Sequence, residues 1–202
     1  KELKVGNGAE EGVSIGPLIN NDAFDKVSAI VEQATSNGAE VLIGGEGTTA
    51  DGENFYQPTV LVNVDDSMDV YNEEIFGPVA SVIRVKDYDE ALATANDTPF
   101  GLSAGICTTS LKYATHYKRN AEAGMVMVNV PTAGVDFHVP FGGSKGGLCI
   151  DPRGQCGRRI FCGYQSIQNV FEVISLDFNF VSRAFDEQPL MFNLRRHASN
   201  AF

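Results

Sequence analysis

Two short stretches of the chain combine residue types that could do chemistry. Residues 71–79 read Tyr-Asn-Glu-Glu-Ile-Phe-Gly-Pro-Val, so two carboxylates stand directly before an apolar segment. A carboxylate near a sheet edge must be solvated or paired with a donor. The stretch therefore predicts one of two arrangements. Either a carboxylate binds ligand hydroxyl groups beside an apolar wall formed by Phe76, or both acids are solvated at the start of a helix or turn.

The second stretch is rich in glycine. Residues 140–147 read Pro-Phe-Gly-Gly-Ser-Lys-Gly-Gly. Glycine clusters permit close backbone approach and positive φ. The spacing matches neither a Walker phosphate loop nor the GxGxxG dinucleotide fingerprint. From spacing alone, a flexible surface loop and a segment that approaches a ligand are equally compatible with it.

Histidine and cysteine are the other candidates for chemistry. His116 lies in a helical pattern and is expected on the surface, whereas His138, beside Phe137, is better suited to contact a ligand than to catalyse. Cys107 falls in an expected strand and is interpreted as a core thiol. Zinc binding by the remaining three cysteines is disfavoured because no CxxC pair occurs, so we expect no metal site. They are Cys149, Cys156 and Cys162.

Composition limits the class of protein. Of the 202 residues, 43% are hydrophobic and 20% charged, which is typical of a globular protein. The net charge of -11 argues against nucleic acid as a partner. No apolar run is long enough to span a bilayer, and no secretory signal precedes the first motif. We therefore expect a cytoplasmic protein with reduced thiols that binds no membrane.

Strand-like and helical blocks alternate along the chain. Helical spacing or caps are expected over residues 20–37, 87–98 and 111–123; strands over 39–43, 55–64, 78–85, 102–108 and 125–130; and a loop over 47–54. Asp87 followed by Glu90 resembles a capping box, and Gly124 is expected to stop the third helix. Strands that alternate with helices of this length predict an α/β fold with a parallel sheet.

Taken together, five motifs resemble the aldehyde dehydrogenase superfamily. They occur in the family's order and approximate spacing, over residues 1–153. The motifs are Ile-Gly-Pro-Leu at 15–18, Tyr-Gln-Pro-Thr-Val at 56–60, Glu-Glu-Ile-Phe-Gly-Pro at 73–78, Asn-Asp-Thr-Pro-Phe-Gly-Leu at 96–102 and Pro-Phe-Gly-Gly-Ser-Lys at 140–145.

The resemblance implies a reaction and a set of contacts. A cysteine thiolate attacks an aldehyde, hydride passes to the nicotinamide of NAD or NADP, and water hydrolyses the resulting thioester. Glu74 would bind the nicotinamide ribose hydroxyls and Phe76 would line the nicotinamide site. Residues 132–138 would form the substrate loop. The expected substrate contacts are Thr132, Val135, Phe137 and Phe141.

Within the superfamily, two groups are similar. Residues 5–19 are similar to succinate-semialdehyde dehydrogenases, and residues 124–136 to 2-oxoglutarate-semialdehyde (2,5-dioxopentanoate) dehydrogenases. Because the second stretch covers the substrate loop, the expected substrate is an ω-oxo acid semialdehyde.

The resemblance also implies that a large part of the enzyme is missing from this chain. The family's cofactor domain, its Gly-Gln-x-Cys nucleophile, its general-base glutamate and its oxyanion-hole asparagine all precede the motifs found here. Cys156 follows Gly-Gln but stands after the glycine-rich motif, so it is not taken as the nucleophile. We expect an incomplete catalytic domain without catalytic residues, inactive alone. Its expected partner is the N-terminal half of the same enzyme, in a full-length homo-oligomer.

The tail departs from the family pattern. Residues 154–202 hold seven of the 13 Phe and no Lys. The codons possible for residues 155–161, read one base out of step, permit Ser-Ala-Ala-Ala-Glu-Phe, which resembles the family's closing helix. We therefore treat residues 1–153 as a partial catalytic domain and residues 154–202 as an atypical tail, with a shifted reading frame as one hypothesis.

Two other functions are open on these residues. A non-catalytic interaction module, or one half of a split enzyme, would reuse the fold without its own nucleophile. An acyl-phosphate or acyl-CoA reductase would share the thioester chemistry, but the Glu-Glu-Ile-Phe-Gly-Pro signature counts against it.

Overall fold

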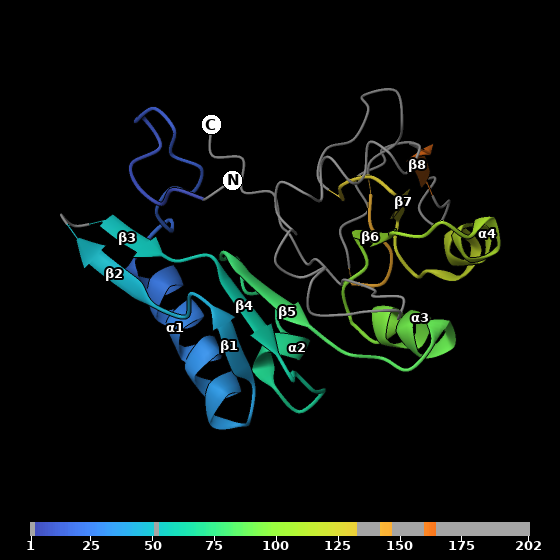
Figure 1. Cartoon of the computed structure of the whole chain (residues 1–202), viewed down its shortest axis with the longest axis horizontal. Coiled ribbons are helices and arrows are strands. Elements are labelled where there is room, and N and C mark those ends of the chain that lie inside the picture. Colours follow the sequence, from blue (N-terminus) through green and yellow to red (C-terminus); the bar gives the residue numbers. More distant parts are fainter. Residues whose placement is uncertain (1–2, 51–52, 133–141, 147–159, 165–202) are drawn as a thin grey trace. The chain divides into compact units, whose positions relative to one another are not determined.

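The computed structural model describes residues 3–50, 53–132, 142–146 and 160–164 (Figure 1). The chain divides between Ile83 and Arg84 into two compact units, each with its own hydrophobic core.

The first unit is built on one long helix. Helix α1 (Asn21–Ser36) begins after Asn20, whose side chain accepts a hydrogen bond of 2.8 Å from the backbone N–H of Ala23. Gly38, with φ +106°, ends the turn that follows, as glycine permits. The buried stripe recurs at helical spacing, which confirms the predicted helix; it comprises Val27, Ile30, Val31 and Ala34.

The strands of this unit are not all parallel. In the order β1-β4-β5, β1 (Glu40–Ile43) is antiparallel to β4 (Thr59–Val62), which is parallel to β5 (Val79–Val82). Strands β2 (Gly47–Ala50) and β3 (Glu53–Tyr56) form an antiparallel pair. The prediction of a wholly parallel sheet is therefore wrong for this unit. The hairpin inserted between β1 and β4 lets the chain return in the opposite direction.

Two local predictions also need correction here. Residues 47–54, expected as a loop, contribute to the β2–β3 pair, because Thr48 supplies a β-branched side chain that suits a strand despite the polar composition. The single strand expected over residues 55–64 is divided into β3 and β4 around Pro58, which has no N–H to donate to a ladder.

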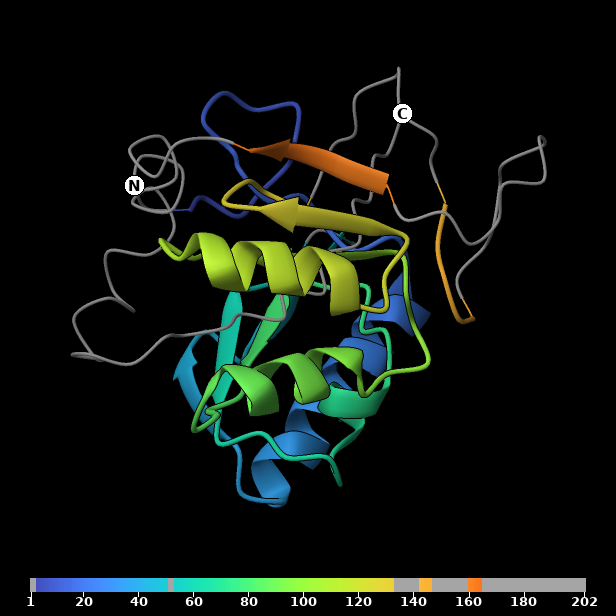
Figure 2. The ribbon, with the colours of Figure 1, turned by 90° about the vertical axis from the view of Figure 1, so that its right-hand side faces the viewer.

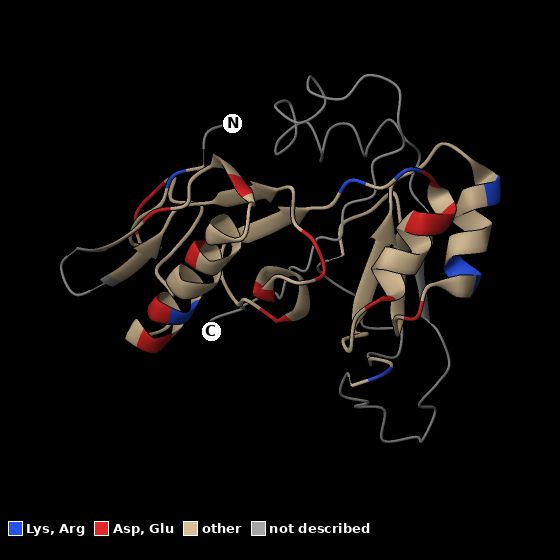
Figure 3. Cartoon of the chain, turned by 90° about the horizontal axis from the view of Figure 1, so that it is seen from below, with Lys and Arg blue, Asp and Glu red and all other residues tan. Residues whose placement is uncertain are grey.

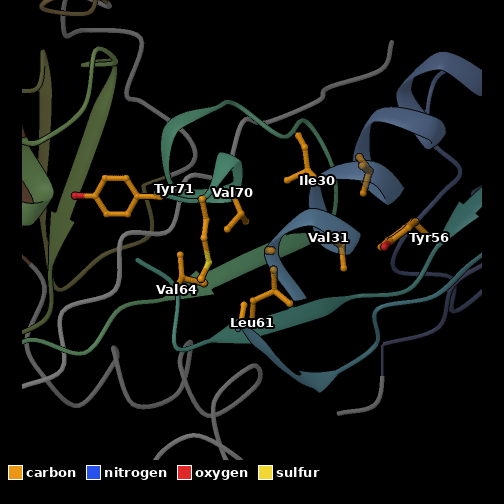
Figure 4. Packing of buried hydrophobic residues seen from close by; sticks show 11 residues of the cluster. Ile30, Val31, Tyr56, Leu61, Val64, Val70 and Tyr71 are labelled. Carbon is orange, nitrogen blue, oxygen red and sulfur yellow. The ribbon is translucent and has the colours of Figure 1, made fainter. Parts of the chain in front are cut away.

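The core of the first unit lies where α1, β4 and the short helix α2 (Asp69–Asn72) meet (Figure 4). Leu61 and Met68 are almost completely buried. Tyr56 is also buried, donates its hydroxyl to the Gly45 carbonyl at 3.3 Å, and has a raised pKa because burial disfavours the phenolate.

The second unit is a parallel α/β arrangement. Its sheet has the order β6-β7-β8, with β6 (Ser103–Ile106), β7 (Met125–Val128) and β8 (Ile160–Tyr164) all parallel. Helix α4 (Leu111–Asn120) connects β6 to β7, and α3 (Tyr88–Asn96) precedes them (Figure 2). Every residue of β7 is buried, as the continuous apolar run predicted.

The helix ends of this unit show one confirmed cap and one correction. The Asp87 side chain accepts from the Glu90 N–H at 2.9 Å, and Glu90 accepts from the Lys86 N–H at 2.8 Å, as expected of a capping-box-like start. Helix α4, in contrast, ends at Asn120, four residues before Gly124. Gly124 is therefore not its stop signal; it is needed for close packing, as shown below.

Charge and length exclude little more. In the part of the chain that the structure describes, no helix is both long enough and apolar enough to cross a membrane. Acidic residues are spread over both units, while α4 carries the basic residues Lys112, Lys118 and Arg119 (Figure 3).

Candidate functional site

The acidic motif forms a turn between α2 and β5. Its first residue, Glu73, ends α2 with an N–H bond of 2.8 Å to the Asp69 carbonyl. The acids thus follow a helix end, and the expectation of a helix start is wrong. The turn leads directly into β5, the strand parallel to β4. We refer to residues 73–78 as the Glu–Phe turn.

The Glu–Phe turn points successive side chains in opposite directions. Ile75 packs against the core of the first unit, whereas Phe76 is 60% exposed. Phe76 also adopts a φ of +52°, which a bulky side chain rarely does. Such a conformation costs about 1–3 kcal/mol and persists only where surrounding contacts enforce it, most often at functional sites. An exposed apolar ring in this backbone conformation marks the turn as a candidate ligand-binding element.

Helix α1 holds the turn by two neighbouring residues. A Cβ atom on Gly77 would lie 2.7 Å from Cγ2 of the buried Val27, so only glycine permits this approach. Lys26 forms an ion pair of 3.1 Å with Glu73 Oε2 and donates to the Glu74 carbonyl at 3.1 Å. Glu74 itself is half-buried. Sequence inspection missed Lys26, because 48 residues separate it from Glu74.

In the second unit, the carboxyl end of β7 is fixed by Asn129. This residue is 2% exposed and has a φ of +58°. Its amide accepts from the Thr108 N–H at 2.8 Å and donates to the Thr108 carbonyl at 3.0 Å. Asn129 was not among the predicted site residues; an asparagine directly after a buried strand, tolerant of positive φ, is the signal that could have indicated it.

Thr132 lies close to the same edge of the sheet. Its Cγ2 atom would be 3.0 Å from a Cβ atom on Gly105 of β6, so the threonine packs where that side chain is missing. Ligands of parallel α/β proteins bind beyond the carboxyl ends of the strands, and Thr132 opens the expected substrate loop there. The other expected substrate contacts and one histidine fall outside the described residues; these are Val135, Phe137, His138 and Phe141.

The glycine-rich motif occupies the opposite edge. Ser144 donates its N–H to Gly101 at 2.8 Å and its hydroxyl to the Glu122 carbonyl at 2.6 Å, and Gly146 donates to Pro99 at 3.0 Å. Gly101 and Gly124 precede β6 and β7, and a Cβ on Gly124 would collide with the carbonyl of Gly142. Residues 142–146 are therefore docked at the amino ends of the strands and are not a mobile surface loop.

Lys145 completes this docking. It forms an ion pair of 2.7 Å with Glu122, donates to the Thr98 carbonyl at 3.1 Å and also contacts the Asn96 carbonyl. The motifs at 96–102 and 140–145 are thus brought together, and the described part of the glycine-rich motif has a structural role.

The remaining candidates carry little chemistry. Cys107 is exposed, which corrects its assignment to the core: β6 ends one residue earlier, at Ile106. Partial desolvation of its sulfur raises the pKa of the thiol and so weakens it as a nucleophile. His116 is exposed as expected, with Nδ1 2.9 Å from the Tyr88 hydroxyl. Among the described residues, no cluster of three His, Cys, Asp or Glu could hold a metal.

A family model decides the assignment. Residues 1–161 match the model described as "Aldehyde dehydrogenase family". The chain belongs to the aldehyde dehydrogenase family. Its relatives are oxidoreductases, and the resemblance inferred from the five motifs is confirmed.

Similar proteins include the two groups that the sequence suggested. The mitochondrial succinate-semialdehyde dehydrogenase of Oryza sativa is 43% identical over 145 residues, covering 72% of this chain and 27% of the relative. The alpha-ketoglutarate semialdehyde dehydrogenase of Haloferax volcanii is 40% identical over 148 residues, covering 72% and 30%. A P. syringae indole-3-acetaldehyde dehydrogenase mutant, solved with NAD+ and IAA, is 34% identical with a TM-score of 0.67, covering 72% and 30%. The chain spans less than a third of the length of each.

Proposed function

We propose that this chain forms part of an NAD(P)-dependent aldehyde dehydrogenase that oxidises an ω-oxo acid semialdehyde to a carboxylate through a thioester. Membership of the family and the two semialdehyde-oxidising relatives support the reaction and the substrate class. The observation that carries the proposal is the Glu–Phe turn, in which an exposed Phe76 with positive φ follows two residues after Glu74.

The turn fits a nicotinamide nucleotide chemically. A carboxylate accepts hydrogen bonds from two vicinal hydroxyls, and an exposed aromatic ring offers an apolar surface to a flat heterocycle. Glu74 would therefore hold the ribose hydroxyls and Phe76 would line the nicotinamide site. When bound, the nicotinamide accepts the hydride that leaves the substrate. The contribution of this chain is to hold and orient the nucleotide.

The substrate contacts are proposed at the carboxyl edge of the second unit. Thr132 lies at this edge, and Val135, Phe137 and Phe141 follow in the proposed substrate loop. The thiolate that forms the thioester, its base and its oxyanion donors would come from the N-terminal half of the enzyme. We propose that the 202-residue chain alone is inactive for this reason.

A two-chain enzyme tests the proposal. The 202-residue chain is co-expressed with the N-terminal part of the Oryza sativa relative, ending where the two sequences begin to match. NADH or NADPH formation is then followed with succinic semialdehyde. We expect reduction only when both chains are present and an aldehyde is added. Stable assembly without aldehyde-dependent reduction would instead indicate an interaction module.

A further inference from the structure

We propose that Lys26 is a positioning residue that divides the two adjacent carboxylates of the Glu–Phe turn between two roles. Glu73 is held by Lys26 and has a structural role, so Glu74 is the carboxylate presented to the nucleotide. This inference rests on the proposed function and deepens it.

The contacts of Lys26 are specific to this turn. Its ammonium lies 3.1 Å from Glu73 Oε2 and 3.1 Å from the carbonyl oxygen of Glu74. One cation thus binds the side chain of the first acid and the backbone of the second. The carbonyl bond fixes the peptide plane between Glu74 and Ile75, and that plane sets the direction in which the following residues leave.

The conformation of the next residues depends on this fixed plane. Ile75 packs against the core, Phe76 points outward at φ +52°, and Gly77 lies against Val27. A positive φ at phenylalanine is unfavourable, so contacts on both sides must enforce it. Lys26 and Val27 are consecutive residues of α1, and they supply contacts before and after Phe76.

Stability does not explain the ion pair. The side chains of Lys26 and Glu73 are 47% and 52% exposed, and pairs so accessible to water add little to folding free energy. The same unit holds a comparable pair, Lys4 and Glu10, which are 3.4 Å apart with 56% and 61% exposure. Lys4→Met is therefore a matched control that removes an exposed ion pair far from the turn in sequence.

The first test uses the 202-residue chain alone. Backbone 15N relaxation is measured for residues 74–77 in the native protein, Lys26→Met, Lys26→Arg and Lys4→Met. We expect order parameters near about 0.85 in the native protein and the Lys4→Met control, and below about 0.6 in Lys26→Met. Lys26→Arg, which keeps the charge and donors, should restore them, and melting temperatures should agree. Unchanged order at residues 74–77 in Lys26→Met would overturn the inference.

The second test uses the two-chain enzyme. Lys26→Met should raise KM for NAD+ by about fivefold, the scale of one lost hydrogen bond, with kcat for succinic semialdehyde nearly unchanged. Glu73→Gln should raise KM less than Glu74→Gln does. A larger effect from Glu73→Gln would overturn the division of roles. If the native two-chain enzyme reduces no NAD+, the proposed function fails, and the relaxation experiment still decides whether Lys26 orders the turn.

Discussion

Asn129 uses its whole side-chain amide on the backbone of Thr108. The amide oxygen accepts from the Thr108 N–H at 2.8 Å, and the amide nitrogen donates to its carbonyl at 3.0 Å. The two residues follow β7 and β6, so this pair ties together the loops at the carboxyl edge of the second sheet. The start of the proposed substrate loop is therefore fixed by a residue with a purely structural role.

Asn129→Ala should be strongly destabilising. It leaves two polar groups of Thr108 without their partner and places alanine at positive φ, so we expect a loss of about 2–4 kcal/mol in urea unfolding. Asn63→Ala is the control, because Asn63 has the same φ of 58° but is exposed. The control should lose about 1 kcal/mol through backbone strain alone. Equal losses would show that the bonds to Thr108 contribute nothing.

Gly124→Ala should release residues 142–146 from the sheet. The added methyl group would meet the backbone of Gly142 and Gly143, which cannot yield as a flexible side chain would. We expect a loss of about 2–3 kcal/mol and faster tryptic cleavage after Lys145. At Gly16, nothing lies within 4 Å of a Cβ position, so Gly16→Ala should change neither property. Native-like cleavage in Gly124→Ala would contradict the docking.

Tyr117 should make the protein sensitive to alkali. Burial raises the pKa of its phenol well above 10.0. Above pH 10 the unfolded chain loses this proton while the folded chain keeps it, so stability present below pH 10 falls as pH rises. Tyr117→Phe should lose less stability than the native protein between pH 8 and pH 11, measured by urea midpoints. Tyr113→Phe, on the exposed side of the same helix, should follow the native protein. A native-like loss in Tyr117→Phe would contradict this.

Local patterns predicted the local structure well. The apolar stripe of α1, the Asp87 cap of α3 and the buried run of β7 each depend on neighbours in sequence, and all three were confirmed. The direction of β1 was not predictable, because it depends on the hairpin placed between β1 and β4. The exposure of Cys107 was missed because β6 ends at Ile106, one residue before it.

The candidate site divides in the same way. Motifs identified the Glu–Phe turn, but not the Lys26 contact that reaches it from α1 across the chain. They also singled out the glycine-rich stretch without revealing that Ser144 and Lys145 dock it at the amino edge of the sheet, since those bonds span more than 20 residues. Non-local contacts, which no short spacing encodes, account for both gaps.

The most direct test of the central claim is KM for NAD+ in the two-chain enzyme carrying Glu74→Gln, with succinic semialdehyde as substrate. Asp66→Asn, which removes another exposed acid of the same unit, is the control. The claim predicts that Glu74→Gln raises KM by about tenfold or more, because charge-assisted bonds to the ribose are lost, while the control is unchanged. An unchanged KM in Glu74→Gln would contradict the assignment of the Glu–Phe turn to the cofactor.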